Sequence, residues 1–267
     1  MGRGYPAGGA FQENEAIFQV NLGMKYNRDL YVHGVKVPRL MLGTSPFLGA
    51  GQFGHRAMEY RKLFYENPEN MTELIAEAAN FGIPYVQALG DEIIAKAIDD
   101  ARELSGKDIQ VVGSVGMYDF DQELEIIRSL NAKIILTHAF ITDRLDDYFG
   151  KCIDEISNTS IAGVATHNPG VTIPELAGYD KVEVVMAPIN KMGKYMSPSA
   201  ERTLKAIQTT DKIVLGKKTL AAGSLGPKDA LEYVSEFVYG VAIGVTSSQE
   251  LRETFGIARE LWGVSKT

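Results

Sequence analysis

The amino-acid sequence predicts an α/β fold, a (β/α)8 TIM barrel with an N-terminal β-hairpin, on three observations. The chain has 267 residues, close to the ~250 residues of such a barrel. Eight short runs are nearly continuous in apolar residues, as are parallel strands buried on both faces. Between them, apolar residues recur every three to four positions, which is typical of covering helices. Eight strands favour a closed barrel, and the alternative is an open doubly wound sheet.

The predicted elements follow one another in a regular order. Residues 30–32 and 35–38, joined by His33-Gly34, are typical of a hairpin, which we expect to plug the N-terminal end of the barrel. The barrel strands are expected at residues 39–43, 85–88, 110–115, 133–137, 161–165, 182–187, 212–215 and 241–245.

Domain organisation is expected to be simple. We find no linker, so we predict a single barrel domain over residues 29–267, preceded by a tail or arm over residues 1–28. The Gly-rich residues 1–10 lack the continuous apolar core of a signal peptide. Residues 47–65 form a segment longer than the ~2–6 residues usual between a strand and its helix. This segment is interpreted either as a lid over the barrel mouth or as a contact in a homo-oligomer.

Composition argues against several classes of partner. The formal net charge is −7 and acids and bases are interspersed, so we expect no nucleic-acid partner. No apolar stretch reaches the ~18 residues of a membrane span, so we expect no membrane partner. Cys152 is the only cysteine, which rules out an intrachain disulfide and agrees with a cytoplasmic location.

Two loops near the C-terminal end predict an anion site. Residues 216–227 and 246–252 each follow an apolar run, are rich in Gly or Ser, and open a helix. Free backbone N–H groups and the positive end of a helix dipole hold phosphate at such places, and in a barrel they follow strands seven and eight. Thr246 and Gln249 have capping-box spacing. The candidate ligand-binding residues are Lys217, Gly223, Ser224, Leu225, Thr246, Ser247, Ser248 and Arg252.

With these segments in place, the chain resembles the aldo-keto reductase superfamily. Residues 32–44 are similar to that family's opening hairpin and first strand, residues 220–227 to its strand-seven loop, and residues 242–253 to its nucleotide-binding last strand and helix. The resemblance spans residues 31–262. It implies an NADPH-dependent carbonyl reductase, and therefore NADP as the candidate cofactor.

The catalytic residues of that family are mostly absent. The resemblance implies a tetrad of Asp, Tyr, Lys and His, but Gln87 stands in place of the aspartate and Ser114 in place of the lysine, and the tyrosine and its loop are missing. Only the histidine is retained, as His138. Met186 and Ile189 replace the glutamine and the ring-stacking tyrosine of the nicotinamide site. Because reduction of a carbonyl needs a poised acid, we expect the family reaction to be lost or modified.

The remaining candidates point to different chemistries. His138 is predicted to act as an acid/base or to orient a carbonyl group, helped by Gln87 and Asn190. Lys191 is a candidate for a Schiff base, against the alternative of a solvated loop lysine. His138 and His167 could bind a metal, but no third ligand is evident beyond Asp143 or Asp91, so we predict no metal site.

We therefore predict an enzyme with an aldo-keto-reductase-like barrel. It would bind a nucleotide or a small phosphorylated or anionic molecule at the C-terminal face of the barrel, with chemistry that has diverged from carbonyl reduction. The alternatives are an NADPH-dependent oxidoreductase with a substituted proton donor, a non-catalytic nucleotide-binding barrel, and a Schiff-base lyase or metal-dependent enzyme.

Overall fold

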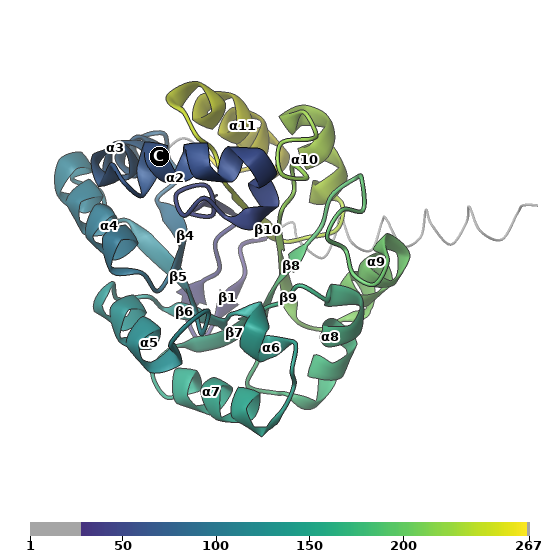
Figure 1. Ribbon diagram of the computed structural model, residues 1–267. Coiled ribbons are helices and arrows are strands. Elements are labelled where there is room, and N and C mark those ends of the chain that lie inside the picture. The colour runs from purple at the N-terminus through teal and green to yellow at the C-terminus, as the bar shows by residue number, and fades with distance from the viewer. Residues whose placement is uncertain (1–27, 266–267) are drawn as a thin grey trace, which may run out of the picture.

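The computed structural model describes residues 28–265. Eight parallel strands close into a barrel in the order β10-β3-β4-β5-β6-β7-β8-β9, and the helices surround it (Figure 1). This confirms the predicted fold. The barrel strands are β3 (Leu40–Gly43), β4 (Tyr85–Leu89), β5 (Gln110–Val115), β6 (Ile134–Thr137), β7 (Ile161–Ala165), β8 (Val184–Pro188), β9 (Ile213–Lys217) and β10 (Gly240–Ile243).

Helices lie between successive strands, with their apolar faces against the barrel. Their buried residues recur at helical spacing, as in α4, where Ile94, Ala97, Ile98 and Ala101 are buried. The helices are α2 (Ala57–Phe64), α3 (Pro68–Asn80), α4 (Glu92–Ser105), α5 (Phe120–Ser129), α6 (Ala139–Thr142), α7 (Asp147–Ser157), α8 (Pro169–Glu175), α9 (Ala200–Thr209), α10 (Pro227–Ser235) and α11 (Ser248–Leu261), with the short 3-10 helices η1 (Gly51–Arg56) and η2 (Leu176–Gly178).

The predicted hairpin is present as β1 (Tyr31–Val32) and β2 (Val35–Lys36), which pair antiparallel. His33 and Gly34 between them have φ angles of 48° and 81°, the left-handed conformation that a two-residue hairpin turn requires. Val32 and Val37 belong to the cluster of buried side chains inside the barrel. The hairpin therefore closes the N-terminal end of the barrel, as predicted.

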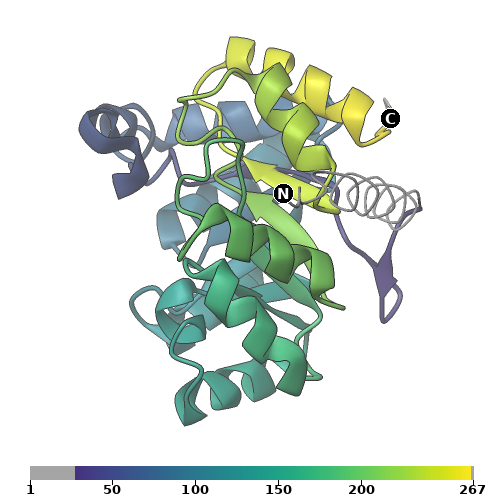
Figure 2. The same ribbon diagram turned by 90° about the vertical axis from the view of Figure 1, so that its right-hand side faces the viewer.

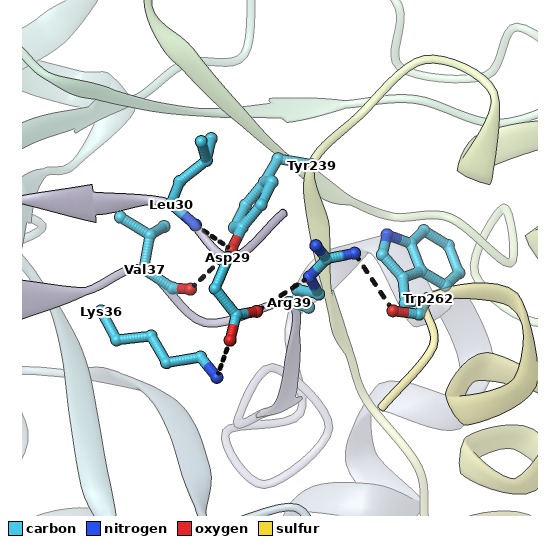
Figure 3. Close-up of polar contacts among 7 residues, drawn as sticks. All are labelled: Asp29, Leu30, Lys36, Val37, Arg39, Tyr239 and Trp262. Atoms are coloured by element: carbon cyan, nitrogen blue, oxygen red, sulfur yellow. Dashed lines mark hydrogen bonds and ion pairs between the residues drawn. The ribbon is translucent and has the colours of Figure 1, made fainter. Parts of the chain in front are cut away.

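A polar network fastens the chain at this closed end (Figure 3). The hydroxyl of Tyr239 accepts a hydrogen bond from Leu30 N at 2.9 Å and donates one to Val37 O at 3.2 Å. Arg39 donates to the carbonyl of Trp262 at 3.1 Å and pairs with Asp29 at 3.4 Å. The network joins the hairpin, the start of β10 and the end of α11.

The segment after the first barrel strand has structure of its own. Residues 47–65 contain η1 and α2, and the rings of Phe47 and Phe64 pack with their centroids 4.7 Å apart. Figure 2 shows this segment, in dark blue, at the opposite end of the barrel from the hairpin.

Of the predicted tail, residues 1–28, only Arg28 is among the described residues. Within the part of the chain that the structure describes, no helix is long and apolar enough to cross a membrane.

Candidate active site at the mouth of the barrel

A cavity of about 780 Å³ opens at the C-terminal ends of the barrel strands. Its floor consists of residues at or just beyond these ends, and the η1–α2 segment forms one wall. Active sites of such barrels lie at this face. Residues that line the floor are Gly43, Gln87, Ser114, His138, Ala165, Met186, Lys217 and Ala242.

The η1–α2 segment reaches across the mouth to the loops on the other side. Tyr195, after β8, donates a hydrogen bond to the carbonyl of Gln52 at 3.3 Å. The guanidinium of Arg56 lies over Gly223, so close that a Cβ at Gly223 would be 2.8 Å from it. The segment therefore lies where a lid over the cavity would lie.

His138 and His167 face each other on the rim. Their ring centroids are 5.5 Å apart and the rings are nearly perpendicular, at 89°. His138 directly follows β6, and its Nδ1 accepts a hydrogen bond from Phe140 N at 3.3 Å. In the neutral ring the proton is then on Nε2, which can donate to a ligand.

Both imidazoles are neutral at neutral pH. Burial lowers the pKa of His138 to about 4, and the positive charge of Lys217 lowers it further against the opposing effect of Asp143. Burial, Lys217 and Lys218 also lower the pKa of His167. His167 is the more exposed of the two side chains, so water screens it more strongly.

Asp143 fixes the loop that carries His167. Its carboxylate accepts hydrogen bonds from the hydroxyls of Thr166 at 2.5 Å and Thr172 at 2.7 Å, and from His167 N at 2.8 Å. These donors occupy both carboxylate oxygens. Among residues 28–265, no group of three or more His, Cys, Asp or Glu side chains could hold a metal ion.

Lys218 and Lys217 are the lysines that line the cavity within the described chain, and Lys217 is the one that belongs to a barrel strand. It is the last residue of β9, two positions after Leu215, which points into the barrel interior. Burial lowers its pKa to about 7, and the like charge of Lys218 contributes. The neutral amine is therefore well populated at neutral pH.

The sequence prediction placed Lys217 in a loop, because the predicted strand ended at residue 215. β9 continues to Lys217, which pairs with Pro188 of β8. Side chains alternate along a strand, so the inward orientation of Leu215 is the signal that would have indicated an inward Lys217.

In the β9–α10 loop, the predicted phosphate-binding donors already have an acceptor. The N–H groups of Gly223, Ser224 and Leu225 converge on the carbonyl oxygen of Leu220, at 3.0, 3.1 and 3.2 Å. The Ser224 hydroxyl accepts a hydrogen bond from Lys194 at 2.9 Å. Gly223 and Leu225 line the cavity, but their role in binding an anion remains a prediction.

In the β10–α11 loop, a carboxylate occupies the predicted position. Glu250 accepts hydrogen bonds from Thr246 N at 2.8 Å and from the Thr246 hydroxyl at 2.9 Å. Ser247, and not Thr246, is the N-cap of α11, since its hydroxyl accepts from Glu250 N at 3.2 Å. The capping spacing predicted for Thr246 and Gln249 is therefore displaced by one residue.

Ser248 and Arg252 turn toward another helix. Both contact the carboxylate of Glu77 in α3: Ser248 through its hydroxyl, and Arg252 through an ion pair at 2.8 Å. Unlike Thr246, neither these residues nor Ser247 and Ser224 line the cavity.

Asn190 and Lys191 also lie outside the cavity lining. Asn190 is buried, and its side chain bonds main-chain atoms of Lys194 and the carbonyl of Lys218. Lys191 forms an ion pair with Asp229 at 2.6 Å, and this hydrogen bond raises its pKa. A raised pKa keeps the amine of Lys191 protonated, which is unfavourable for a nucleophile.

Comparison with solved structures finds aldo-keto reductases among the proteins of similar fold. A protein named as an aldo-keto reductase of Pseudomonas aeruginosa is similar with a TM-score of 0.64 and 17% identity, covering 88% of this chain and 95% of that one. For an aldo-keto reductase from a Medee basin deep-sea metagenome library the TM-score is 0.58, the identity 12%, and the coverage 90% and 95%. For aldose reductase from Giardia lamblia the TM-score is 0.56 and the identity 14%, and the match covers 83% of this chain and 87% of that one.

The predicted resemblance is thus confirmed at the level of the fold. No protein-family model and no curated protein sequence matches the chain. At such low identity, activity has to be argued from the residues of the site.

Proposed function

We propose that this chain is an enzyme that binds a small phosphorylated or otherwise anionic carbonyl compound in the mouth of the barrel and orients its carbonyl group through His138. The observation that carries the proposal is a set of cationic side chains without acidic partners. Arg56, Arg61, Lys217 and Lys218 all line the cavity. Over residues 28–265, none of the four is within 4.0 Å of a carboxylate oxygen.

Acidic residues also line the cavity, so the number of charges alone does not decide its preference. Asp91, Glu123, Glu250 and Glu253 are in its lining. The first three accept hydrogen bonds from protein donors, and Glu123 accepts four from the backbone N–H groups of residues 116–119. Three of the cations lie over aromatic rings, Arg56 over Tyr60, Arg61 over Tyr65 and Lys218 over Tyr195. No carboxylate neutralises their charges, whereas the acids are largely hydrogen-bonded, so the uncompensated charges favour an anionic ligand.

NADP(H) fits these residues poorly. The donors expected to hold its phosphates are directed at Leu220 O, Glu250 and Glu77. Carboxylates at the start of α11 repel phosphate. Ile189, where the family has its ring-stacking tyrosine, is fully buried and does not line the cavity. We therefore propose no hydride step.

The proposed chemistry uses His138 and its neighbours. A neutral imidazole at the edge of the cavity can hydrogen-bond a carbonyl oxygen through Nε2 and orient it. Gln87 and Ser114, on neighbouring strands below it, offer further uncharged polar groups to the ligand. In this proposal His138 keeps its predicted role of orienting a carbonyl group, and no tyrosine is needed as a proton donor.

Thermal shift and calorimetric titration with glycerol 3-phosphate test the proposal. A ligand that binds the folded state raises the apparent stability, so we expect a shift that the Arg56→Ala/Arg61→Ala double variant removes. Losing one charged hydrogen bond weakens binding by about 1.5–3 kcal/mol. Arg252→Ala is the matched control, because Arg252 pairs with Glu77 outside the cavity.

Two outcomes would contradict the proposal: no shift with glycerol 3-phosphate, or equal losses in the Arg252 control. NADPH is titrated in parallel. If it bound more tightly than glycerol 3-phosphate, the oxidoreductase alternative would be favoured, since the barrel fold is shared with reductases.

A further inference from the structure

The amine of Lys217 lacks the polar partner that the amines of Lys191 and Lys212 have. Lys191 has Asp229 as its partner, and Lys212, the residue before β9, donates from Nζ to the carbonyl of Tyr179 at 3.4 Å. For Lys217, no hydrogen bond or ion pair of the amine occurs within the described residues. A partly buried amine without a partner is costly for the fold.

Strand alternation directs this amine into the barrel. Leu215 belongs to the interior cluster. A Cβ on Gly216 would contact Ile189 and Val238, which belong to the layer between the barrel and the helices. Lys217 is therefore on the inner side again and lines the cavity.

The positions around Lys217 leave space for a reactant. Most barrel interiors of this kind are filled by bulky branched side chains. Here four residues of the cavity lining at the strand ends are small, namely Gly43, Ser114, Ala165 and Ala242. A carbonyl compound in the cavity can thus approach the end of the Lys217 side chain.

We propose that Lys217 is a catalytic residue that forms a Schiff base with a small anionic aldehyde or ketone in this cavity. The inference rests on the proposed function, because the cations at the mouth would bind the anionic group of that compound. Lysine amines react with carbonyl groups in this way when a poorly solvated site keeps them neutral. Lys217 thus takes the place of Lys191 as the candidate for the Schiff base, because the amine of Lys191 is paired with Asp229 outside the cavity.

The step balances without a further reactant. The lone pair of neutral Nζ attacks the carbonyl carbon, and the electron pair of the C=O bond moves onto oxygen. Both protons of the amine pass to that oxygen, which leaves as water and gives an imine. Uptake of one solvent proton by the imine nitrogen gives the iminium ion, which withdraws electrons from the adjacent carbon. Neutral His138 can hydrogen-bond the carbonyl oxygen through its Nε2–H during the attack, and it keeps its own proton.

The surrounding charges favour the neutral amine. Lys218, the next residue, carries a like charge and lowers the pKa of Lys217, while Asp143 opposes this effect. His138 and His167 face the same space as neutral rings. Asp143 itself is occupied by three donors, so it does not form an ion pair with the lysine.

Trapping with pyridoxal 5′-phosphate tests the inference, because this probe carries an aldehyde and a phosphate. The folded protein is treated with a limiting amount, reduced with borohydride, and mapped by peptide mass spectrometry. We expect the label at residue 217 in the wild type and in Lys191→Arg, whose lysine lies outside the cavity, and its absence from that position in Lys217→Arg. Labelling first at Lys218, Lys191 or another lysine would overturn the inference.

A second measurement does not depend on the choice of probe or on a variant that folds. Trace acetylation with acetic anhydride across a pH series reports the reactivity of each lysine in the wild-type protein. We expect Lys217 to reach half of its full reactivity at least two pH units below Lys191. Equal midpoints would overturn the inference.

Pyridoxine 5′-phosphate separates this inference from the proposed function. It carries the same phosphate but an alcohol in place of the aldehyde. If it binds and the aldehyde does not label Lys217, the Schiff base is wrong and the anion site stands. If it does not bind, while Lys217 is still acetylated at low pH, the proposed anion site is wrong and the reactive lysine stands.

Discussion

The two ends of the barrel differ in whether their positively charged side chains have acidic partners. At the N-terminal end, Asp29 is paired with both Lys36 and Arg39, and the hydroxyl of Tyr239 makes two hydrogen bonds (Figure 3). At the mouth, Arg56 and Lys217 have no carboxylate partner within the described chain.

This difference separates stability from function within one fold. Satisfied buried groups stabilise a protein, whereas a desolvated cation without a partner destabilises it. Perturbed titratable groups in a cleft mark candidate functional sites. We interpret the network at the closed end as structural and the cations at the mouth as groups that are kept for a ligand.

The largest expected effect follows from replacing Lys217 by methionine, which has a similar shape and no charge. We expect Lys217→Met to increase the free energy of unfolding below pH 7, because it removes the cost of a desolvated cation. A pKa shift of one unit corresponds to about 1.4 kcal/mol, and the pKa of Lys217 is lowered from 10.5 to about 7. Denaturant unfolding of both proteins at several pH values measures the gain.

The sign of the pH dependence is fixed by the direction of that shift. Between about pH 7 and pH 10.5 the unfolded state binds more protons at Lys217 than the folded state, so this residue makes stability rise with pH. The advantage of Lys217→Met should therefore be greatest below pH 7 and disappear as the pH rises toward 10.5. A constant difference across this range would show that the lysine is not desolvated. Lys191→Met serves as the control, because Asp229 raises the pKa of Lys191 instead of lowering it.

The next effect has the opposite sign and lies at the other end of the barrel. Tyr239→Phe removes the hydroxyl that accepts from Leu30 N and donates to Val37 O. Both main-chain groups then lose this hydrogen-bond partner beside the buried ring of residue 239. We expect a loss of about 1–3 kcal/mol in the free energy of unfolding. Tyr233→Phe, on α10, is the control, and the comparison would break if both variants lost the same amount.

The sequence was sufficient to predict the barrel, its eight strands and the hairpin, because these depend on apolar periodicity and on the His33-Gly34 turn. It was not sufficient to show which donors of the two loops are free. Ala221 and Ala222 adopt φ angles of 50° and 58°, a left-handed conformation that side chains other than glycine rarely adopt and that composition does not signal. The loop therefore curls so that its N–H groups reach Leu220 O.

Errors of one or two residues at element ends displaced other site residues. With β9 taken to end at residue 215, Lys217 became a loop residue, although it is the inward end of the strand. With Thr246 taken as the cap, Glu250 had no assigned role, although its carboxylate lies at the start of α11. Strand and cap bounds are the parts of a fold that local sequence defines least.

The smallest effect concerns Glu250. This acid lies in the lining of the mouth and is hydrogen-bonded, like the paired groups at the closed end. Glu250→Gln retains an oxygen that can accept from Thr246 and removes the negative charge from the cavity lining. We expect affinity for glycerol 3-phosphate to rise by about 0.2–1 kcal/mol, while the helix loses about 0.3–1 kcal/mol because an acid near its N-terminus is favourable. Glu260→Gln, near the other end of α11, removes the same charge far from the mouth and should leave the affinity unchanged. If Glu250→Gln weakened binding instead, Glu250 would be a ligand-binding residue, and the mouth would be built for a ligand that carries a hydrogen-bond donor.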